Sequence, residues 1–233
     1  MIDPTGLDRV LMLFAHPDDE TLAAGGTIAR LVRGGTRIHV AIAATGSFAR
    51  RNTVGAADLA AAHGRLVEDA RCAMAILGVT EGDLTLGPFP DNAMDTVPLL
   101  DVIQWLEAII DDVKPQAVFT HHQRCTNIDH RICHEAAVVA TRPLPGQRIA
   151  LLAGEVPSST GILRPTGWEP NCYMALERRD LDSKIAAMQA YAGEARPSPH
   201  PRSPEVLTAL ATLRGAEAGT FFAEAFMIER WVL

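Results

Sequence analysis

Apolar stretches of strand length alternate with helical patterns over the first two thirds of the chain, and this alternation restricts the fold most. The apolar runs occupy residues 10–15, 37–44, 84–86 and 117–120. Between them, apolar residues at helical spacing predict helices over residues 20–33, from about 59 to 77, and over 99–113. A repeated strand–helix order favours a mostly parallel sheet with helices on both faces. We therefore predict a three-layer α/β fold.

The last third of the chain has a less regular pattern. It predicts strands over residues 150–155 and 171–176, a helix over 181–192, and another helix that ends near residue 216, and residues 225–232 close the chain. A Pro-rich segment, residues 193–204, separates the two helices. No linker or repeat divides the chain. We expect residues 1–233 to form one domain, in which residues from about 150 to 233 complete the site and supply substrate loops.

Composition narrows the classes of partner and compartment. The hydrophobic content of 48% supports a sizeable core, and a net charge of −7 without a basic block argues against nucleic acid or an anionic membrane as partner. No apolar stretch approaches membrane-spanning length, and the first residues lack the pattern of a signal peptide. The four cysteines form no CxxC pair. These features predict a protein of the reducing cytoplasm.

Two polar clusters follow predicted strands. His16, Asp18 and Asp19 come directly after the first apolar run, and a His-rich stretch, residues 121–134, comes after the run at 117–120. In open α/β sheets, ligands bind in the crevice outside the carboxyl ends of the strands. Pro17-Asp18-Asp19 is also good turn and helix N-cap sequence, which is the alternative interpretation. A histidine beside the acidic pair, together with the second cluster, favours a metal site.

The residue types suit a catalytic zinc site. Such a site takes about three protein ligands, drawn from His nitrogen and carboxylate oxygen, and keeps a position open for water. His16 and Asp19 can converge from one turn, which leaves Asp18 as a neighbouring carboxylate able to act as general base. The third ligand is left open by spacing, since four histidines compete for it: His121, His122, His130 and His134. His130 and His134 lie four residues apart on one helix face, so they could supply two ligands together.

The run Leu-Met-Leu-Phe-Ala-His-Pro-Asp-Asp-Glu, residues 11–20, resembles the opening of the PIG-L/LmbE-like family of zinc-dependent N-deacetylases. Four further motifs stand in the family's order: Arg65-x-x-Glu68, Phe89-Pro90-Asp91, Thr120-His121-His122 and Asn127-Ile128-Asp129-His130-Arg131. The resemblance implies a Rossmann-like fold. It also implies a hydrolase that removes an acetyl or other acyl group from an N-acetylglucosamine-type amino sugar or its conjugate.

The same resemblance implies a role for each matching residue. His16 and Asp19 match the first two ligands of the Zn2+ ion, and His130 matches the third. Asp18 matches the general base that activates the zinc-bound water, and Asp129 matches a carboxylate that hydrogen-bonds an active-site histidine. Positions that contact the sugar in some relatives are matched by Arg65 and Asp91. His134 is then a helix-packing residue.

The chain departs from the family's pattern at two positions. Asn127 stands where many relatives have a histidine; an amide can donate a hydrogen bond to an oxyanion but is no general acid at neutral pH. Cys125 stands where other relatives carry an aspartate. The proton for the leaving amine then comes from Asp18, acting as both base and acid, or from His200 in the Pro-rich segment.

Two other classes of function compete with the deacetylase. One is a non-catalytic Rossmann-like protein that binds a sugar or a nucleotide, and the other is a metal-dependent phosphoesterase. We expect a small-molecule N-acyl amino sugar or glycoconjugate as substrate, and a homo-oligomer is left open. Specificity is expected to lie in loops such as residues 45–53 and 156–170, where Trp168 could stack on a sugar or seal a subunit interface.

Overall fold

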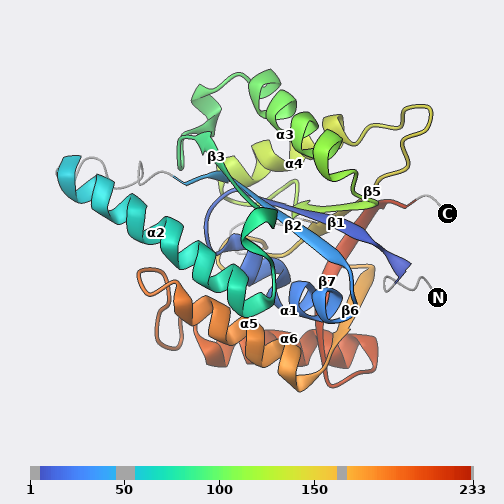
Figure 1. Ribbon diagram of the computed structural model, residues 1–233. Helices are drawn as coiled ribbons and strands as arrows, with labels where there is room; N and C mark the ends of the chain where they lie inside the picture. The colour runs from blue at the N-terminus through green and yellow to red at the C-terminus, as the bar shows by residue number, and fades with distance from the viewer. Residues whose placement is uncertain (1–5, 46–55, 162–166, 232–233) are drawn as a thin grey trace.

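Seven strands form one sheet in the order β3-β2-β1-β4-β5-β7-β6 (Figure 1). The computed structural model describes residues 6–45, 56–161 and 167–231. The strands are β1 (Arg9–Phe14), β2 (Arg37–Ala44), β3 (Leu84–Phe89), β4 (Ala117–His121), β5 (Ala150–Gly154), β6 (Cys172–Leu176) and β7 (Phe222–Arg230). Strands β1 to β5 pair in parallel, whereas β7 is antiparallel to both of its neighbours.

Helices cover both faces of this sheet. They are α1 (Asp19–Arg33), α2 (Ala56–Leu77), α3 (Leu99–Val113), α4 (Ile128–Ala140), α5 (Arg178–Ala190) and α6 (Pro204–Ala218), with short 3-10 turns at Glu81–Asp83 and Met94–Thr96. Figure 1 shows α3 and α4 on one side of the sheet, and α1, α5 and α6 on the other. None of the described helices combines the length and the apolar character needed to cross a membrane.

The strand β1 shows how the sequence builds three layers. Its residues alternate between faces, so Val10, Met12 and Phe14 enter the apolar cluster shared with α1, α2 and α5. Leu11 and Leu13 enter the second cluster, which α3 and α4 cover. Both sets are buried, which is why the run lacks polar alternation. The predicted α/β fold, with a mostly parallel sheet between helical layers, is confirmed.

Several predicted boundaries are wrong. Strand β3 continues to residue 89 instead of ending at 86, because Pro88 and Phe89 still pair with Ala44 through an irregular register. Helix α5 begins at residue 178 instead of 181, where Glu177 and Asp180 form a capping box. Helix α6 continues to residue 218, two residues past the expected end. The end of the chain, for which no element was predicted, forms strand β7 and inserts between β5 and β6.

The strand order reverses at β1. Strands β2 and β3 extend the sheet to one side of it, and β4 and β5 extend it to the other. Such a switch point leaves a crevice outside the carboxyl ends of the two central strands, because the chain leaves them in opposite directions. The turns that follow β1 and β4 therefore meet at one place.

A buried ion pair fastens the last third of the chain to α1. Lys184 Nζ lies 2.5 Å from Glu224 Oε1 and also donates to the carbonyl of Leu22. Glu224 accepts hydrogen bonds from the backbone N–H groups of Gly26 and Thr27. In a regular α-helix, the N–H of residue 26 bonds to the carbonyl of residue 22. Lys184 and Glu224 thus bond to the carbonyl and the N–H group that would otherwise pair with each other within α1.

Two glycines in α1 permit this close approach. A Cβ atom added to Gly26 would lie 2.5 Å from a methyl carbon of Leu176, and one added to Gly25 would lie 3.0 Å from Cγ of Lys184. The pair Gly25-Gly26 therefore serves helix–strand and helix–helix packing.

We predict that Lys184→Met lowers the free energy of unfolding by about 3 kcal/mol, because it leaves the Glu224 carboxylate buried without its cation. Urea denaturation followed by circular dichroism measures the loss. Arg178→Met is the matched control on the same helix; it removes an exposed pair with Asp182 and should cost about 0.5 kcal/mol or less. A loss in Lys184→Met as small as in the control would contradict a structural role for the buried pair.

Candidate metal centre

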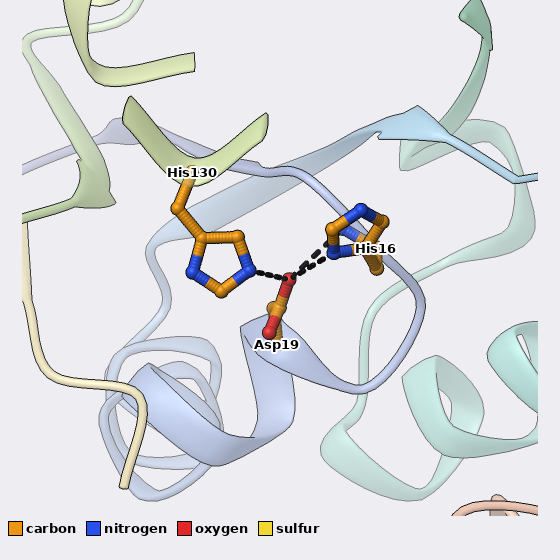
Figure 2. A group of neighbouring side chains, drawn as sticks. All are labelled: His16, Asp19 and His130. Atoms are coloured by element: carbon orange, nitrogen blue, oxygen red, sulfur yellow. Dashed lines mark hydrogen bonds and ion pairs between the residues drawn. The ribbon is translucent and has the colours of Figure 1, made fainter. Parts of the chain in front are cut away.

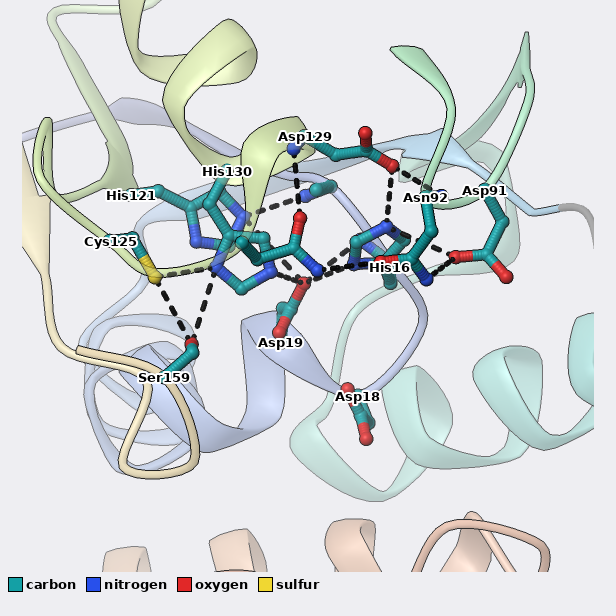
Figure 3. A network of polar contacts seen from close by, with 12 residues as sticks. His16, Asp18, Asp19, Asp91, Asn92, His121, Cys125, Asp129, His130 and Ser159 are labelled. Atoms are coloured by element: carbon teal, nitrogen blue, oxygen red, sulfur yellow. Dashed lines mark hydrogen bonds and ion pairs between the residues drawn. The ribbon is translucent and has the colours of Figure 1, made fainter. Parts of the chain in front are cut away.

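The predicted metal ligands lie together at the switch point. His16, Asp18 and Asp19 form the turn between β1 and α1, and His130 lies in the first turn of α4, just after β4. Figure 3 shows His16, Asp19 and His130 close together, with Asp18 to one side of them. The packing of β1 beside β4 thus brings together residues that lie far apart in the sequence.

Three side chains offer ligand atoms that face one another (Figure 2). Asp19 Oδ2 lies 3.2 Å from His16 Nδ1 and 3.1 Å from His130 Nε2. Each residue offers one ligand atom, and the three atoms lie within 4.8 Å of one another. Two imidazole nitrogens and a carboxylate oxygen form a donor set that suits a catalytic zinc ion.

The other three histidines between which spacing could not choose each make a different polar contact. His121 Nε2 accepts a hydrogen bond from the Ala15 backbone N–H at 2.8 Å, so its lone pair is not directed at a metal. His134 Nε2 pairs with Glu229 at 2.7 Å. His122 Nδ1 accepts from the Arg124 N–H, and its ring packs edge-on against Trp168. Geometry therefore favours His130 among the four histidines between which spacing could not choose.

Asp129 holds His16 in a defined orientation. Its Oδ2 lies 2.9 Å from His16 Nε2, on the side of the ring opposite to Asp19. The backbone N–H groups of Asn92 and Met94 donate to the two oxygens of the same carboxylate. In the neutral imidazole, a carboxylate in this place holds the proton on Nε2, so that the Nδ1 lone pair can face a metal ion.

The acidic neighbours favour positive charge at the centre of the cluster. Burial lowers the pKa of His16, but hydrogen bonds to Asp129 and Asp19 outweigh it and raise this pKa to about 10. Burial likewise lowers the pKa of His130, while the charge of Asp19 raises it to about 9. Burial raises the pKa of Asp19, but His130 and His16 hold it well below its usual range. The same carboxylates would stabilise a divalent cation bound between the two histidines.

Asp91 and Asn127 border the cluster. Asp91 Oδ1 lies 3.2 Å from His16 Nε2 and accepts from the Asn92 side-chain amide. Asn127 Oδ1 accepts from the Asp129 N–H as the N-cap of α4, and its Nδ2 donates to Asn92 Oδ1 at 2.9 Å. His16, Asp91 and Asp129 form a second possible ligand group, but in it Asp129 already accepts two backbone hydrogen bonds.

Cys125 and Ser159 contact the far nitrogen of His130. The Cys125 sulfur lies 3.1 Å from His130 Nδ1, and Ser159 Oγ lies 3.4 Å from the same atom (Figure 3). Burial raises the pKa of Cys125, but the contact with His130 outweighs it and lowers this pKa. Ser159 was not predicted as a site residue, because nothing in its local sequence distinguishes it from any loop serine.

Asp18 is buried and strained. It lies in the left-handed region with φ of 103°, at the N-cap of α1, yet its side chain makes no capping hydrogen bond. Arg202 Nη2 lies 3.1 Å from its Oδ2. Burial and the charge of Asp19 raise the pKa of Asp18 well above its usual range, against the opposing charge of Arg202.

Two further predicted residues lie at the surface. His200 is exposed, and its Nδ1 accepts from the Arg202 backbone N–H. Arg65 is an exposed side chain on α2. Of the expected specificity loops, residues 46–53 and 162–166 lie outside the described residues. Sequence reasoning missed Arg202, whose only signal was its place in the Pro-rich segment beside His200.

Comparison with known proteins places the chain in a family. The model of the GlcNAc-PI de-N-acetylase (PIG-L) family matches residues 11–141. A 1D-myo-inositol 2-acetamido-2-deoxy-alpha-D-glucopyranoside deacetylase of Mycobacterium sp. (strain KMS) is 33% identical over 131 residues, which cover 48% of this chain and 42% of that protein. The chain thus spans less than half the length of this relative.

Two solved structures share the fold. The N,N'-diacetylchitobiose deacetylase of Pyrococcus horikoshii gives a TM-score of 0.74 at 18% identity, over 96% of this chain and 84% of that one. The 4-carboxy-2-hydroxymuconate hydratase GalB of Pseudomonas putida KT2440 gives 0.75 at 23% identity, over 97% of this chain and 98% of that one. Because a deacetylase and a hydratase share the fold, function has to be argued from the site.

The family match confirms the resemblance carried by residues 11–20 and by the motifs downstream. It covers more than half of the 233 residues and includes both strand ends that supply the cluster. The chain therefore belongs to the GlcNAc-PI de-N-acetylase (PIG-L) family.

Proposed function

We propose that this protein is a zinc-dependent N-deacetylase that acts on an N-acetylglucosamine-type amino sugar or its conjugate. One observation carries the proposal: His16, Asp19 and His130 direct ligand atoms at one point beside a buried carboxylate, Asp18, that is not among the ligands. The named deacetylases among the relatives support the same reaction class.

The residues present fit a zinc ion. His16, Asp19 and His130 would hold it, and the contact between Asp129 and His16 matches the carboxylate partner that zinc-bound histidines commonly have. When bound, zinc supplies Lewis-acid chemistry that polarises an acyl oxygen and acidifies water. No ligand of this set is a thiolate, because Cys125 lies behind His130 rather than among the three donor atoms.

Asp18 carries the proton transfers in this proposal. Its carboxylate takes a proton from the attacking water as the new bond forms between the water oxygen and the acyl carbon. The C–N bond then breaks and the proton passes to the amine nitrogen, which gives the free carboxylic acid and the amine. The raised pKa of the buried Asp18 suits a group that must hold a proton near neutral pH. His200 is exposed, so we assign both steps to Asp18.

The substrate is proposed to be a small molecule that enters beside Asp91. This carboxylate contacts His16 and lies at the edge of the cluster, where it could accept hydrogen bonds from sugar hydroxyls. Arg65 is retained as a substrate contact on the family resemblance. The four cysteines are free thiols, which supports action in a reducing compartment such as the cytoplasm.

We predict that His130→Gln abolishes tight zinc binding while His134→Gln retains it. Both histidines lie on α4, but only His130 offers a nitrogen to Asp19 and His16, whereas His134 pairs with Glu229. Titration calorimetry of chelator-treated protein with zinc, together with metal analysis, measures the difference. Equal zinc affinity in the two variants would exclude His130 as a ligand.

We predict that Asp18→Asn lowers kcat for acetate release by about 100-fold or more and leaves the zinc content unchanged, because the amide cannot accept the proton from water. The assay uses an N-acetylglucosamine conjugate, with and without a chelator. Activity of the wild type should be lost with the chelator and restored by zinc. Full acetate release from the variant would remove Asp18 from the role of general base.

The same assays separate the competing functions. A phosphoesterase would release inorganic phosphate from a panel of sugar phosphates and no acetate from the N-acetyl conjugates. A non-catalytic binding protein would bind the conjugate without turnover, whether or not zinc is present. Either result would overturn the deacetylase proposal.

A further inference from the structure

A chain of charges leads from the Pro-rich segment between α5 and α6 to Asp18. Arg202 Nη1 lies 2.5 Å from Glu194 Oε2, and its Nη2 lies 3.1 Å from Asp18 Oδ2. All three groups are at least partly buried; Asp18 is 1% exposed. The last third of the chain thus supplies a cation to the turn that follows β1.

Asp18 depends on an outside partner for its orientation. Its positive φ places the side chain away from the usual N-cap position, and no capping hydrogen bond holds it. Among the described residues, Arg202 is the only cationic side chain within 4 Å of this carboxylate. A buried carboxylate without a compensating charge is costly, so the ion pair contributes to keeping Asp18 in place.

The contact leaves the carboxylate able to accept a proton. Arg202 Nη2 is close to Asp18 Oδ2, but the two are not aligned as a hydrogen bond, and Oδ2 accepts no other hydrogen bond from the described residues. A bidentate arginine would have donated a hydrogen bond to each of the two carboxylate oxygens. Arg202 Nη1 donates a hydrogen bond to Glu194, whereas Nη2 interacts with Asp18 as an ion pair without a hydrogen bond.

The segment that carries Arg202 is stiff. Prolines at 197, 199, 201 and 204 restrict its backbone, and the His200 ring accepts from the Arg202 N–H within the same turn. Ser203 then caps α6 by accepting from the Val206 N–H. Arg202 is therefore presented from a backbone that is fixed on both sides.

We propose that Arg202 is a positioning residue for the hydrolysis, which holds the Asp18 carboxylate in the orientation needed for proton transfer, and that Glu194 holds Arg202. This inference rests on the proposed function of Asp18 as the base. Among the described residues, Arg202 forms ion pairs with Asp18 and Glu194 and none with His16, Asp19 or His130, although its charge also acts on Asp19.

Arg202→Met tests this role, with Arg196→Met as the matched control. Both arginines line the same cavity of about 220 Å3, so both substitutions change the same wall, but Arg196 donates to the backbone carbonyls of Gly193 and Ala195. We expect Arg202→Met to lower kcat by about 100-fold with KM and zinc content unchanged, since a displacement of 1 Å in a reacting group can cost this much. Arg202→Lys should recover part of the loss.

A double-variant cycle with Asp18→Asn tests whether the two residues act as one unit. If Arg202 works through Asp18, adding Arg202→Met to Asp18→Asn lowers kcat by less than twofold further. Independent, multiplied losses would overturn the positioning role and indicate direct contact with substrate. A loss of activity shared by Arg196→Met, or a loss of zinc, would overturn it as well.

Crystal structures of the two single variants give a readout that needs no activity. The Asp18 carboxylate should move in Arg202→Met and stay in place in Arg196→Met; an unmoved carboxylate in both would refute the inference. Wild-type protein that binds zinc but releases no acetate would instead refute the proposed function. The two failures are thus told apart.

Discussion

The parallel pairing of β1 with β4 is the constraint on which the site depends. Backbone pairing joins Val10, Leu11 and Met12 to residues 117–119, and past the end of β1 the Ala15 N–H continues toward β4 by donating to the His121 ring. This one side-chain hydrogen bond ties the exits of the two strands together. It also occupies the His121 nitrogen that could otherwise bind a metal, which leaves the stacked ring of His130 to face Asp19 in the candidate site.

The site concentrates carboxylates and then balances them from different elements. Asp18, Asp19 and Asp129 lie within one small region, and in water-poor surroundings each requires a partner. Asp129 accepts hydrogen bonds from two backbone N–H groups in the segment after β3. Asp19 contacts the imidazole nitrogens of two histidines. Of the three, Asp18 alone pairs with a side chain from the described residues of the last third of the chain. These partners suit the proposed roles, in which Asp129 orients His16, Asp19 binds the metal and Asp18 transfers a proton.

The fold class could be predicted from the sequence, because buried parallel strands and amphipathic helices produce hydrophobic patterns among residues that are close in the sequence. It also placed His16, Asp18 and Asp19 at a strand end, because the turn and the strand are adjacent in the chain. Spacing could not choose between His121 and His130, because the choice depends on which ring nitrogen a distant backbone group occupies. Arg202 and Ser159 were out of reach for the same reason: each meets the site only through tertiary packing.

The contact of Lys184 and Glu224 with α1 has a consequence for how such enzymes can be recombined. The family model ends at residue 141, yet the helix that carries Asp19 is bonded to α5 and β7, which lie beyond that limit. The part of the chain that matches the family model is therefore not an independent, transplantable unit. A chimera that exchanges the back of the chain has to supply a lysine and a glutamate that fit the two glycines of α1, or the helix beneath the candidate metal site loses its anchor.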